Sequence, residues 1–300
     1  MRLILNPASR SGNGKKLWNF WKKSLEKANV NFEYFETKSA RHAFELANES
    51  TIDVVSVGGD GTINQVINGV MESNNHKAMG VLYAGTSPDF CTFHNIPINK
   101  QKAINILTSN NKKKVDVVEI TYSDNDGKKI KGYFACSCNI GLGADIARFA
   151  NKWRKLFGDI IGTGLGVLKS IVFHKTFTSN LIIDMQTFCF NHTNHIFIIK
   201  NPFIASGIKL SLNITTDDGK MFVLVLHKFS RLQLLMILKS LYTGKITQNK
   251  NVFLKECKTI SVNLANKKEI EFDGDPKGFS DLSVKIIPRA LSLICGDTNA

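Results

Sequence analysis

The sequence has few prolines and no pair of cysteines at metal-binding spacing. It holds six prolines in 300 residues, and its six cysteines form no CxxC pair, which argues against a structural zinc site. No apolar run reaches the roughly 18 residues that a membrane-spanning helix needs. The short apolar run at the start ends at Asn6-Pro7 and is too brief for the core of a signal peptide. We therefore expect a cytoplasmic protein with reduced, free thiols.

Acidic residues are scarce relative to basic ones. The chain carries 39 Lys and Arg against 25 Asp and Glu, a formal net charge of +14. Such a surface favours nucleic acid, anionic lipid or phosphorylated small molecules, and a plain solvated basic surface is the alternative. The sequence shows neither arginines interleaved with aromatic residues on a strand nor a recognised nucleic-acid motif, so we expect no nucleic-acid partner.

The pattern of apolar residues changes about one third of the way along the chain. Up to about residue 115, short apolar runs alternate with helical spacing, which predicts a parallel sheet with helices on both faces. Ligands of such sheets bind at the carboxyl ends of the strands. Beyond that point most segments are typical of strands, interrupted by helical patterns over about 145–175, with glycines 162, 164 and 166 as possible breaks, and over about 230–242. We expect an α/β domain over 1–118 and a β-rich domain over 119–288, with a return of 289–300 to the first domain left open.

The stretch VSVGGDGTINQVING, residues 56–69, joins a predicted strand to a predicted helix. Glycines at a strand end let a ligand approach the backbone, and the free N–H groups that begin the next helix attract phosphate. Asp60 adds a carboxylate that could hold Mg²⁺ or position a hydroxyl, while Thr62 could cap the helix and donate to a phosphate oxygen. The loop is neither a Walker A sequence nor GxGxxG. A tight turn without a ligand is the alternative.

GGDGT, preceded by NPASRSGNGK, resembles the diacylglycerol kinase catalytic family. Five further segments resemble family motifs in the same order: NPASRSG, ETKSARHA, YAGTSPDF, TTDDGK and EFDGDP. That family includes bacterial diacylglycerol kinases and sphingosine kinases, and shares its nucleotide-domain design with NAD kinases and 6-phosphofructokinases. The resemblance implies an α/β nucleotide-binding domain with a parallel sheet, followed by a β-sandwich domain.

The resemblance also implies where ATP would bind. The candidate nucleotide residues lie after predicted strands or in the helix that follows, where a parallel sheet builds a phosphate site. They are Asn6, Ser9, Gly12, Thr37, Gly58, Gly59, Asp60, Gly61, Thr62, Gln65, Gly85 and Thr86.

Two acidic segments near the C-terminus carry the remaining implied roles. In EFDGDP, Asp275 takes the place of the family's proton acceptor and Asp273 the acidic position before it; two carboxylates on one strand could raise each other's pKa, which suits a base. In TTDDGK, Asp218 matches a position that binds a second, structural Mg²⁺ in some bacterial members, with Thr215 and Lys220 as carbonyl ligands. An acidic hairpin turn is the alternative for both segments.

Three residues depart from the family pattern. Pro88 replaces an asparagine of the GTxND loop, Gln65 replaces a glutamate, and Asp275 is one methylene shorter than the expected glutamate. Proline removes a donor, and a carboxylate displaced by about 1 Å can matter greatly for catalysis. These changes leave the phosphate-binding core in place and favour altered substrate choice or weak activity.

The helical pattern after residue 145 has a basic amphipathic character. Its apolar positions include Ile146, Phe149, Trp153, Leu156, Phe157 and Ile160, and lysines and arginines lie among them. Such a helix suits the surface of an anionic membrane, and a helix that covers the β-rich domain is the alternative.

We therefore expect an ATP- and Mg²⁺-dependent lipid kinase of phospholipid metabolism that binds membranes peripherally and transfers the γ-phosphate to diacylglycerol or a related lipid. A kinase for another lipid alcohol, such as a sphingoid base, and a nucleotide- or lipid-binding homologue with weak or no catalysis are the alternatives. A homodimer is possible by analogy alone.

Overall fold

The computed structural model describes residues 1–10, 12, 14–39, 41–124, 126–204, 208–242, 245–273 and 275–296. For residues 147, 151, 154–157, 159–160, 238–239, 241–242, 245 and 275–276 it describes the backbone alone. The chain divides into two compact units. Unit 1 comprises Met1–Val117, Thr215–Asp218 and Ile287–Ala300, and unit 2 comprises Val118–Ile214 and Gly219–Ile286.

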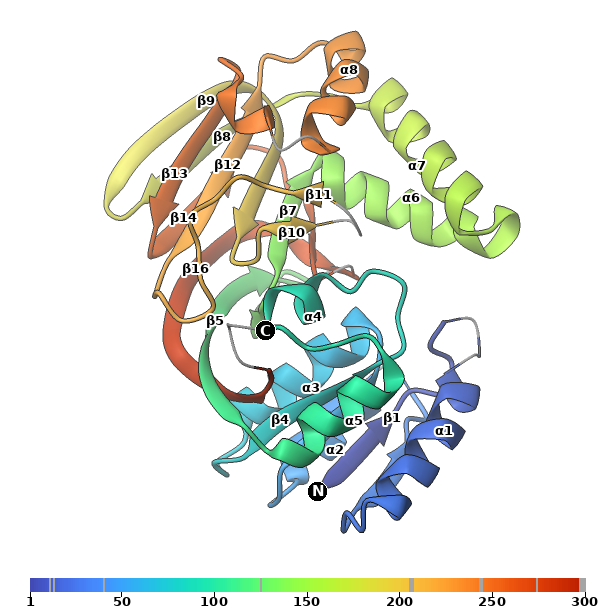
Figure 1. The fold of residues 1–300 in the computed structure, drawn as a ribbon. Helices are drawn as coiled ribbons and strands as arrows, with labels where there is room; N and C mark the ends of the chain where they lie inside the picture. The colour runs from blue at the N-terminus through green and yellow to red at the C-terminus, as the bar shows by residue number, and fades with distance from the viewer. Residues whose placement is uncertain are drawn as a thin grey trace. The chain divides into compact units, whose positions relative to one another are not determined.

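Unit 1 alternates strands with helices, as the sequence predicts (Figure 1). Its strands β2, β1, β3 and β4 lie side by side in that order, all parallel, and the end of β16 extends the sheet beside β4 through Ser292 and Leu293. The elements are β1 (Arg2–Leu5), α1 (Gly14–Lys27), β2 (Glu33–Glu36), α2 (His42–Glu49), β3 (Val54–Gly58), α3 (Asp60–Glu72), β4 (Ala78–Tyr83), α4 (Asp89–Phe93), α5 (Lys100–Ser109) and the start of β5 (Lys112–Ser123).

Helices cover both faces of this sheet. On one face, Trp18 and Trp21 of α1 and Leu107 of α5 join a buried cluster with alternate residues of β1, β3 and β4. The buried side chains of α2 and α3 lie outside that cluster, and these two helices pack on each other and on the strands, which places them on the opposite face. The alternation of side chains along each strand supplies both faces with apolar groups.

Three separate chain segments make up unit 1, and the buried Asp116 joins them. Its backbone N–H donates to Thr216 O at 2.8 Å, and its carboxylate accepts the backbone N–H of Arg289 at 2.8 Å. Arg289 in turn lies 3.7 Å from the carboxylate of Asp217. The excursion Thr215–Asp218 therefore belongs to unit 1, which nothing in the sequence indicated.

Unit 2 is rich in antiparallel strands. The pairs β7·β9, β9·β8, β8·β14, β14·β16, β16·β15 and β15·β7 form a closed cycle, and the long strands β9 and β16 each take part in two stretches of pairing. The strands are β6 (Lys129–Phe134), β7 (Ser137–Gly141), β8 (Phe177–Ile183), β9 (Gln186–Ile199), β10 (Phe203–Ile204), β11 (Ile208–Lys209), β12 (Met221–His227), β13 (Val252–Cys257), β14 (Thr259–Leu264), β15 (Glu269–Phe272) and β16 (Asp275–Ile294), with the second part of β5.

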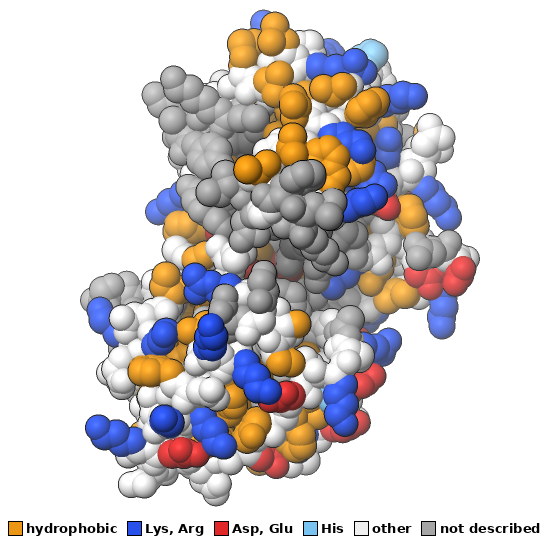
Figure 2. Space-filling view, turned by 90° about the vertical axis from the view of Figure 1, so that its right-hand side faces the viewer, with side chains coloured by type: hydrophobic (Ala, Val, Ile, Leu, Met, Phe, Trp, Pro, Cys, Tyr) orange, Lys and Arg blue, Asp and Glu red, His pale blue; other side chains and the backbone are white. Residues whose placement is uncertain are grey.

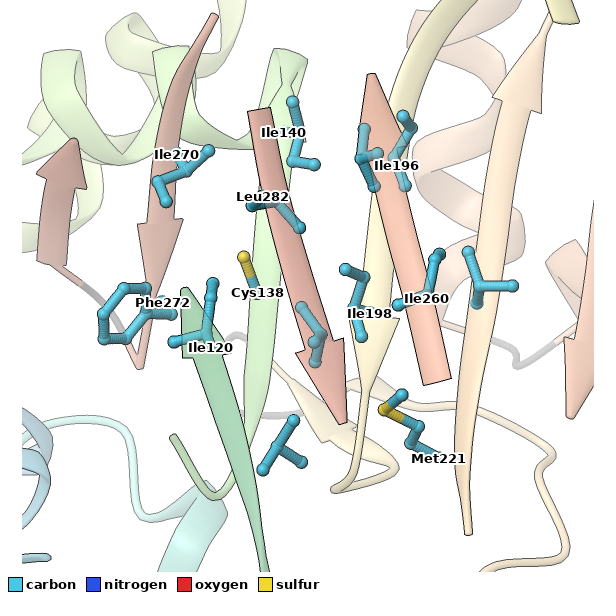
Figure 3. Packing of buried hydrophobic residues seen from close by; sticks show 14 of the residues in the cluster. Ile120, Cys138, Ile140, Ile196, Ile198, Met221, Ile260, Ile270, Phe272 and Leu282 are labelled. Atoms are coloured by element: carbon cyan, nitrogen blue, oxygen red, sulfur yellow. The ribbon is translucent and has the colours of Figure 1, made fainter. Parts of the chain in front are cut away.

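The core of unit 2 lies inside that cycle of strands. Figure 3 shows Ile140, Ile196, Ile260, Ile270 and Leu282, from five different strands, pointing toward one another. All five side chains are at most 3% exposed. Burial of this many branched apolar side chains stabilises a β-rich unit independently of any ligand.

The helical elements of unit 2 confirm the two predicted interruptions, but the break in the first lies elsewhere. These elements are α6 (Leu142–Phe157), α7 (Asp159–Phe173), α8 (Arg231–Tyr242) and the short 3₁₀ helix η1 (Lys245–Gln248). The first interruption breaks at Gly158, whose φ is +77°, and α7 continues through Gly162, Gly164 and Gly166, so the expected break at those glycines is wrong. A left-handed φ favours glycine at the junction. Inside α7, Gly166 allows close packing, because a Cβ there would lie 2.8 Å from the backbone nitrogen of Ala150.

Candidate functional site

The glycine loop of unit 1 lies where β3 ends and α3 begins. Helix α3 starts at Asp60 with Gly59 as the preceding residue. The Gly59 carbonyl accepts the N–H groups of Thr62 and Ile63 at 3.0 Å each, and the N–H groups before them have no carbonyl acceptor earlier in the helix. The next loop packs directly on it: Ala84 N–H donates to Gly58 O at 2.8 Å, and a Cβ on Gly85 would lie 2.8 Å from Gly59 Cα. Two backbone segments in contact beside a helix N-terminus make a compact surface for a phosphate chain.

Asn6 connects the first loop of the sheet to the start of α3. Its side-chain amide donates to Thr62 Oγ1 at 3.0 Å, and its side-chain oxygen accepts the N–H of Ala8 at 3.1 Å. Thr62 is the third residue of the helix and no side chain caps its start, so the expectation that Thr62 caps α3 is wrong. Its buried hydroxyl instead fixes the loop after β1 beside the glycine loop.

The other predicted nucleotide residues lie in the same loops or on α3. Thr37 follows β2, and its N–H donates to Leu5 O at 2.8 Å, which brings it to the end of β1. Gly12 has a φ of +89°, and Thr86 follows Gly85 after β4. Within the described residues, no group hydrogen-bonds the buried Ser9 Oγ. A buried hydroxyl without a protein partner is a natural contact for a bound polar ligand.

Gln65 lies on α3, about one helical turn after Thr62. Its side-chain oxygen Oε1 is buried, and the described part of the chain supplies it with no hydrogen-bond partner. The departure from the family's glutamate therefore leaves a polar group available to a ligand's donor.

Asp60 is held by Tyr83, a residue that sequence reasoning missed. The phenol O–H donates to Asp60 Oδ2 at 2.9 Å. Burial, followed by the charge of Asp60, raises the pKa of Tyr83 far above its usual range, so the hydroxyl remains a donor at any physiological pH. Tyr83 is the last residue of β4. Because it ends a buried apolar run, the sequence pattern indicated a core side chain and not a residue of the site.

A magnesium ion at Asp60 would need ligands beyond the protein. In the portions of the chain that the structure covers, no three His, Cys, Asp or Glu side chains gather into a metal-binding group. Mg²⁺ commonly binds to one or two carboxylates and completes its shell with phosphate oxygens and water. Asp60 at the glycine loop therefore fits an ion that arrives with a nucleotide, and does not fit a protein-built cage.

In unit 2, EFDGDP forms a tight hairpin between β15 and β16. Phe272 pairs with Asp275, and Asp273 occupies the turn with a φ of +50°. The two aspartates thus lie in the turn and on the outgoing strand, so the expectation that they share the face of one strand is wrong. The side chain of Asp275 lies outside the described residues, and its role as a proton acceptor stays a prediction.

Asp273 has a clear structural contact. Its carboxylate accepts the backbone N–H groups of Ala135 at 3.1 Å, Cys136 at 2.9 Å and Ser137 at 3.3 Å. Amide donors stabilise an ionised carboxylate. Asp273 therefore anchors the hairpin to the bend between β6 and β7.

A buried polar chain continues from this hairpin. The Asn139 amide donates to Glu271, and His195 Nε2 lies 3.3 Å from Asn139 Oδ1. His195 Nδ1 accepts the N–H of Gly143 at 3.1 Å, which assigns the ring proton to Nε2. Burial lowers the pKa of His195 to about 3, so the ring stays neutral. This chain, which no sequence motif revealed, fixes β15 and β7 relative to the start of α6.

The three residues predicted for the second metal site all make hydrogen bonds within the protein. In unit 1, the Asp218 carboxylate accepts the N–H of Thr215 at 2.7 Å, which makes the segment a closed turn. In unit 2, the carbonyl of Lys220 accepts a hydrogen bond from the Lys200 ammonium at 3.1 Å. The turn that was the alternative for this segment is present, and the metal site stays a prediction.

Comparison with known proteins agrees with these features. Residues 1–120 match the model of the diacylglycerol kinase catalytic domain, and residues 136–295 match that of the YegS C-terminal NAD kinase beta sandwich-like domain. A diacylglycerol kinase of Staphylococcus saprophyticus is 23% identical over 290 residues, which cover 92% of this chain and 89% of that protein.

Solved structures show the same fold. A diacylglycerol kinase of Bacillus anthracis superposes with a TM-score of 0.72 at 19% identity, covering 100% of this chain and 97% of that one. Yeast NADH kinase superposes with a TM-score of 0.54 at 11% identity, covering 99% of this chain and 84% of the other. The fold expected from the sequence, an α/β domain followed by an NAD-kinase-like β-rich domain, is confirmed.

Proposed function

Because the chain belongs to the diacylglycerol kinase catalytic family, with the C-terminal domain of the YegS type, we propose that it transfers the γ-phosphate of ATP to the hydroxyl of diacylglycerol or a closely related lipid. Membership of the family supports ATP as the phosphate donor and a lipid as the acceptor. The acceptor itself is our inference, since the relatives that bear the name diacylglycerol kinase are only distantly similar.

One observation carries the proposal: the packed pair of loops at Gly59 and Gly85 beside the N-terminus of α3, with Asp60 held by Tyr83. Phosphoryl transfer depends on positioning and on neutralising charge that spreads over phosphate oxygens. The α3 N-terminus would contact the phosphates, and Asp60 would orient the Mg²⁺ that accompanies ATP. Mg²⁺ would offset phosphate charge when bound.

The proton of the acceptor hydroxyl also needs a destination. Asp273 already accepts three backbone N–H groups, which suits an anchor better than a base. Asp275, the first residue of β16, is therefore our candidate for the base. Asp60 belongs to unit 1 and Asp275 to unit 2, so each unit carries one residue of the proposed mechanism.

The residues that depart from the family pattern support two alternatives to diacylglycerol phosphorylation: a kinase for another lipid alcohol, and a homologue that binds nucleotide without turnover. Pro88 directly precedes helix α4 and offers neither the backbone N–H nor the side-chain amide of an asparagine, so this loop differs chemically from one with an asparagine. The shorter Asp275 would favour an acceptor whose hydroxyl lies closer to the backbone, such as another lipid alcohol. Binding of nucleotide without turnover is the second alternative.

The test is transfer from γ-labelled ATP, with Mg²⁺, to a panel of lipids in mixed micelles. The panel contains diacylglycerol, monoacylglycerol, ceramide and a sphingoid base, with NAD as a soluble acceptor. Labelled phosphatidic acid would support the proposal, and a different labelled lipid would redirect it. Nucleotide binding without any labelled product would contradict catalysis.

The partner that we propose for unit 2 is an anionic membrane surface. Among the described residues, none of the helices combines the length and the apolar character needed to cross a bilayer. Exposed apolar side chains instead gather on α7 and α8, two helices that contact each other (Figure 2). This apolar face consists of Ile161, Leu168, Val172, Phe173, Leu232, Leu235 and Met236. Lys169, Arg231 and Lys175 accompany it in the sequence and supply positive charge.

This face differs from the one expected on α6. Phe149 and Trp153 are half-buried, and the ammonium of Lys169 lies 4.6 Å and 5.3 Å from their ring centres. The side chains of Leu156, Phe157 and Ile160 lie outside the described residues. Apolar side chains on α7 and α8 with basic neighbours suit an interfacial surface better.

The double change Phe173→Glu and Met236→Glu should weaken binding to phosphatidylglycerol vesicles by about tenfold or more. These side chains are 70% and 60% exposed, so folding should not suffer. Vesicle co-sedimentation measures the effect, at several salt concentrations. The matched control is Met185→Glu, because Met185 is 94% exposed on the turn between β8 and β9, away from this face in the sequence. Equal binding by both variants would contradict the assignment.

A further inference from the structure

Unit 2 has a pocket of about 540 Å³ at the start of strand β8. Three segments line it: residues 175–178, where α7 leads into β8, residues 191 and 192 of β9, and residues 265, 266 and 268 between β14 and β15. Strand β8 pairs with both β9 and β14, which brings the three segments together. Pockets for small ligands typically have volumes of roughly 300–1,000 Å³, so the size of this basic pocket suits one.

The lining of the basic pocket combines positive charge with neutral polar groups. Lys175 and Lys268 carry ammonium groups, whereas Thr176, Asn191 and Asn266 carry a hydroxyl and two amides. Among the described residues that line the pocket, none has a carboxylate. Phosphate oxygens accept hydrogen bonds from all of these groups, and the bonds from ammonium groups are the strongest.

Two acidic side chains of this region share one arginine. Glu269, which follows Lys268 in the chain, lies 3.2 Å from the guanidinium of Arg148. Asp145 lies 3.1 Å from the same guanidinium. In the part of the chain that the structure describes, neither Lys175 nor Lys268 forms an ion pair. Their positive charge is therefore available to an anionic ligand.

Phe177 helps to position the Lys268 ammonium. The ammonium lies 5.3 Å from the centre of the Phe177 ring, which is the range of a cation–π contact. The ring packs on the core of unit 2, and a Cβ on Gly141 would lie 2.8 Å from its Cε1 atom. The backbone N–H of Lys268 donates to Ser280 Oγ at 3.1 Å. A cation held in this way loses less conformational freedom when a ligand binds.

The buried ring of His174 is affected by the charge of the pocket. His174 directly precedes Lys175, is 8% exposed, and its Nε2 has no hydrogen-bond partner among the described residues. Burial lowers the pKa of His174, the Asp145 carboxylate opposes this effect, and the charges of Lys268 and Arg231 add to it. An anion beside Lys268 would offset that charge, so His174 can report on binding.

We propose that the basic pocket binds the phosphate group of an anion, which is either a soluble phosphorylated compound or the headgroup of an anionic lipid. The phosphate oxygens would accept hydrogen bonds from Lys175 and Lys268, with the neutral side chains as further donors. All lining residues belong to unit 2, whereas the glycine loop belongs to unit 1. This inference does not rest on the lipid acceptor or on catalysis.

The test compares two double variants that lose the same charge. Lys175→Gln with Lys268→Gln alters the pocket, and Lys250→Gln with Lys267→Gln alters two exposed lysines outside its lining. Calorimetric titration with glycerol 3-phosphate should show binding about tenfold weaker or more in the pocket variant than in the control variant. Binding of this probe at the glycine loop is common to both variants, so their difference isolates the pocket.

Vesicles distinguish the two sources of phosphate. Both variants are sedimented with phosphatidylcholine vesicles that contain phosphatidic acid, and with vesicles whose negative charge comes from oleate, which has no phosphate. Weaker binding of the pocket variant to phosphatidic acid alone identifies a lipid headgroup, and a deficit with glycerol 3-phosphate alone identifies a soluble ligand. If the two variants bind glycerol 3-phosphate equally and do not differ specifically on phosphatidic acid, the proposal is wrong. The soluble experiment contains no membrane, so its result is independent of the surface proposed for α7 and α8.

NMR titration of the His174 ring tests the position of the anion. Saturating glycerol 3-phosphate should raise the pKa of His174 in the parent protein, because the phosphate offsets the charge of Lys268. In Lys268→Gln this pKa should be higher from the outset and should not respond to the probe. A pKa of His174 that stays unchanged in the parent when the probe is bound would contradict a phosphate beside Lys268.

Discussion

Replacing Asp60 with alanine is expected to lower kcat for phosphoryl transfer by about a thousandfold or more while the protein stays folded. Asp60 opens helix α3, and its carboxylate receives a hydrogen bond from Tyr83 at 2.9 Å. Without that carboxylate, the Mg²⁺ of the nucleotide would lose its attachment to the protein, and the γ-phosphate would lose its alignment. Initial rates with γ-labelled ATP and the accepted lipid measure the effect, with circular dichroism to confirm folding.

Tyr83→Phe is the matched control for this prediction. It removes the donor to Asp60 and leaves the carboxylate in place, so we expect a loss of about tenfold, far less than that of Asp60→Ala. Titration with a fluorescent ATP analogue separates binding from catalysis. If Asp60→Ala kept kcat within a few fold of the parent, Asp60 would have no role at the metal, and the glycine loop would bind a nucleotide for another purpose.

The sequence predicted the parts of this protein that depend on local patterns. The glycine loop follows a buried strand and precedes an amphipathic helix, and each of these signals spans only a few residues. Asn6 and Thr37 could be placed because parallel strands end at the same edge of a sheet. In the structure Leu5 pairs with both Glu36 and Val57, which brings the ends of β1, β2 and β3 together.

Features that depend on contacts between segments far apart in the sequence could not be predicted from local patterns. A glycine inside a helix is a poor helix former, so three glycines after residue 160 indicated a break. The close approach of α7 to Ala150, which needs Gly166, is visible only once α6 and α7 are packed together. The ammonium of Lys200 likewise contacts a carbonyl 20 residues away along the chain, and no motif relates the two.

The hairpin EFDGDP shows the same limit at the candidate site. The motif correctly indicated a turn, since DG is a strong hairpin signal, and family resemblance assigned a chemical role to both aspartates. Sequence spacing could not reveal that Asp273 bonds to amides more than 130 residues earlier in the chain. Its long-range contacts separate an anchoring carboxylate from a candidate base only two residues away.

Because Asp273 anchors the hairpin and Asp275 is the candidate base, substitutions of these two residues should have different effects. Asp273→Ala removes the acceptor of three backbone N–H groups, two of which belong to buried residues. Each buried donor that is left without a partner costs about 1–3 kcal/mol. We therefore expect the free energy of unfolding to fall by roughly 3 kcal/mol. Urea unfolding followed by fluorescence measures this change.

Asp275→Asn should have the opposite profile, with little change in the free energy of unfolding and a fall of kcat by about 10²–10⁴-fold, the typical contribution of a general base. Asp275→Glu restores the residue expected from the family and keeps a carboxylate, so it should retain most of kcat or raise it.

A pH profile sharpens the distinction between these two variants. The loss of a base removes the rise of kcat/KM with pH in Asp275→Asn and leaves it in Asp275→Glu. If Asp273→Asn instead lowered kcat by 10²-fold or more at unchanged stability while Asp275→Asn stayed active, the roles of the two residues would have to be exchanged.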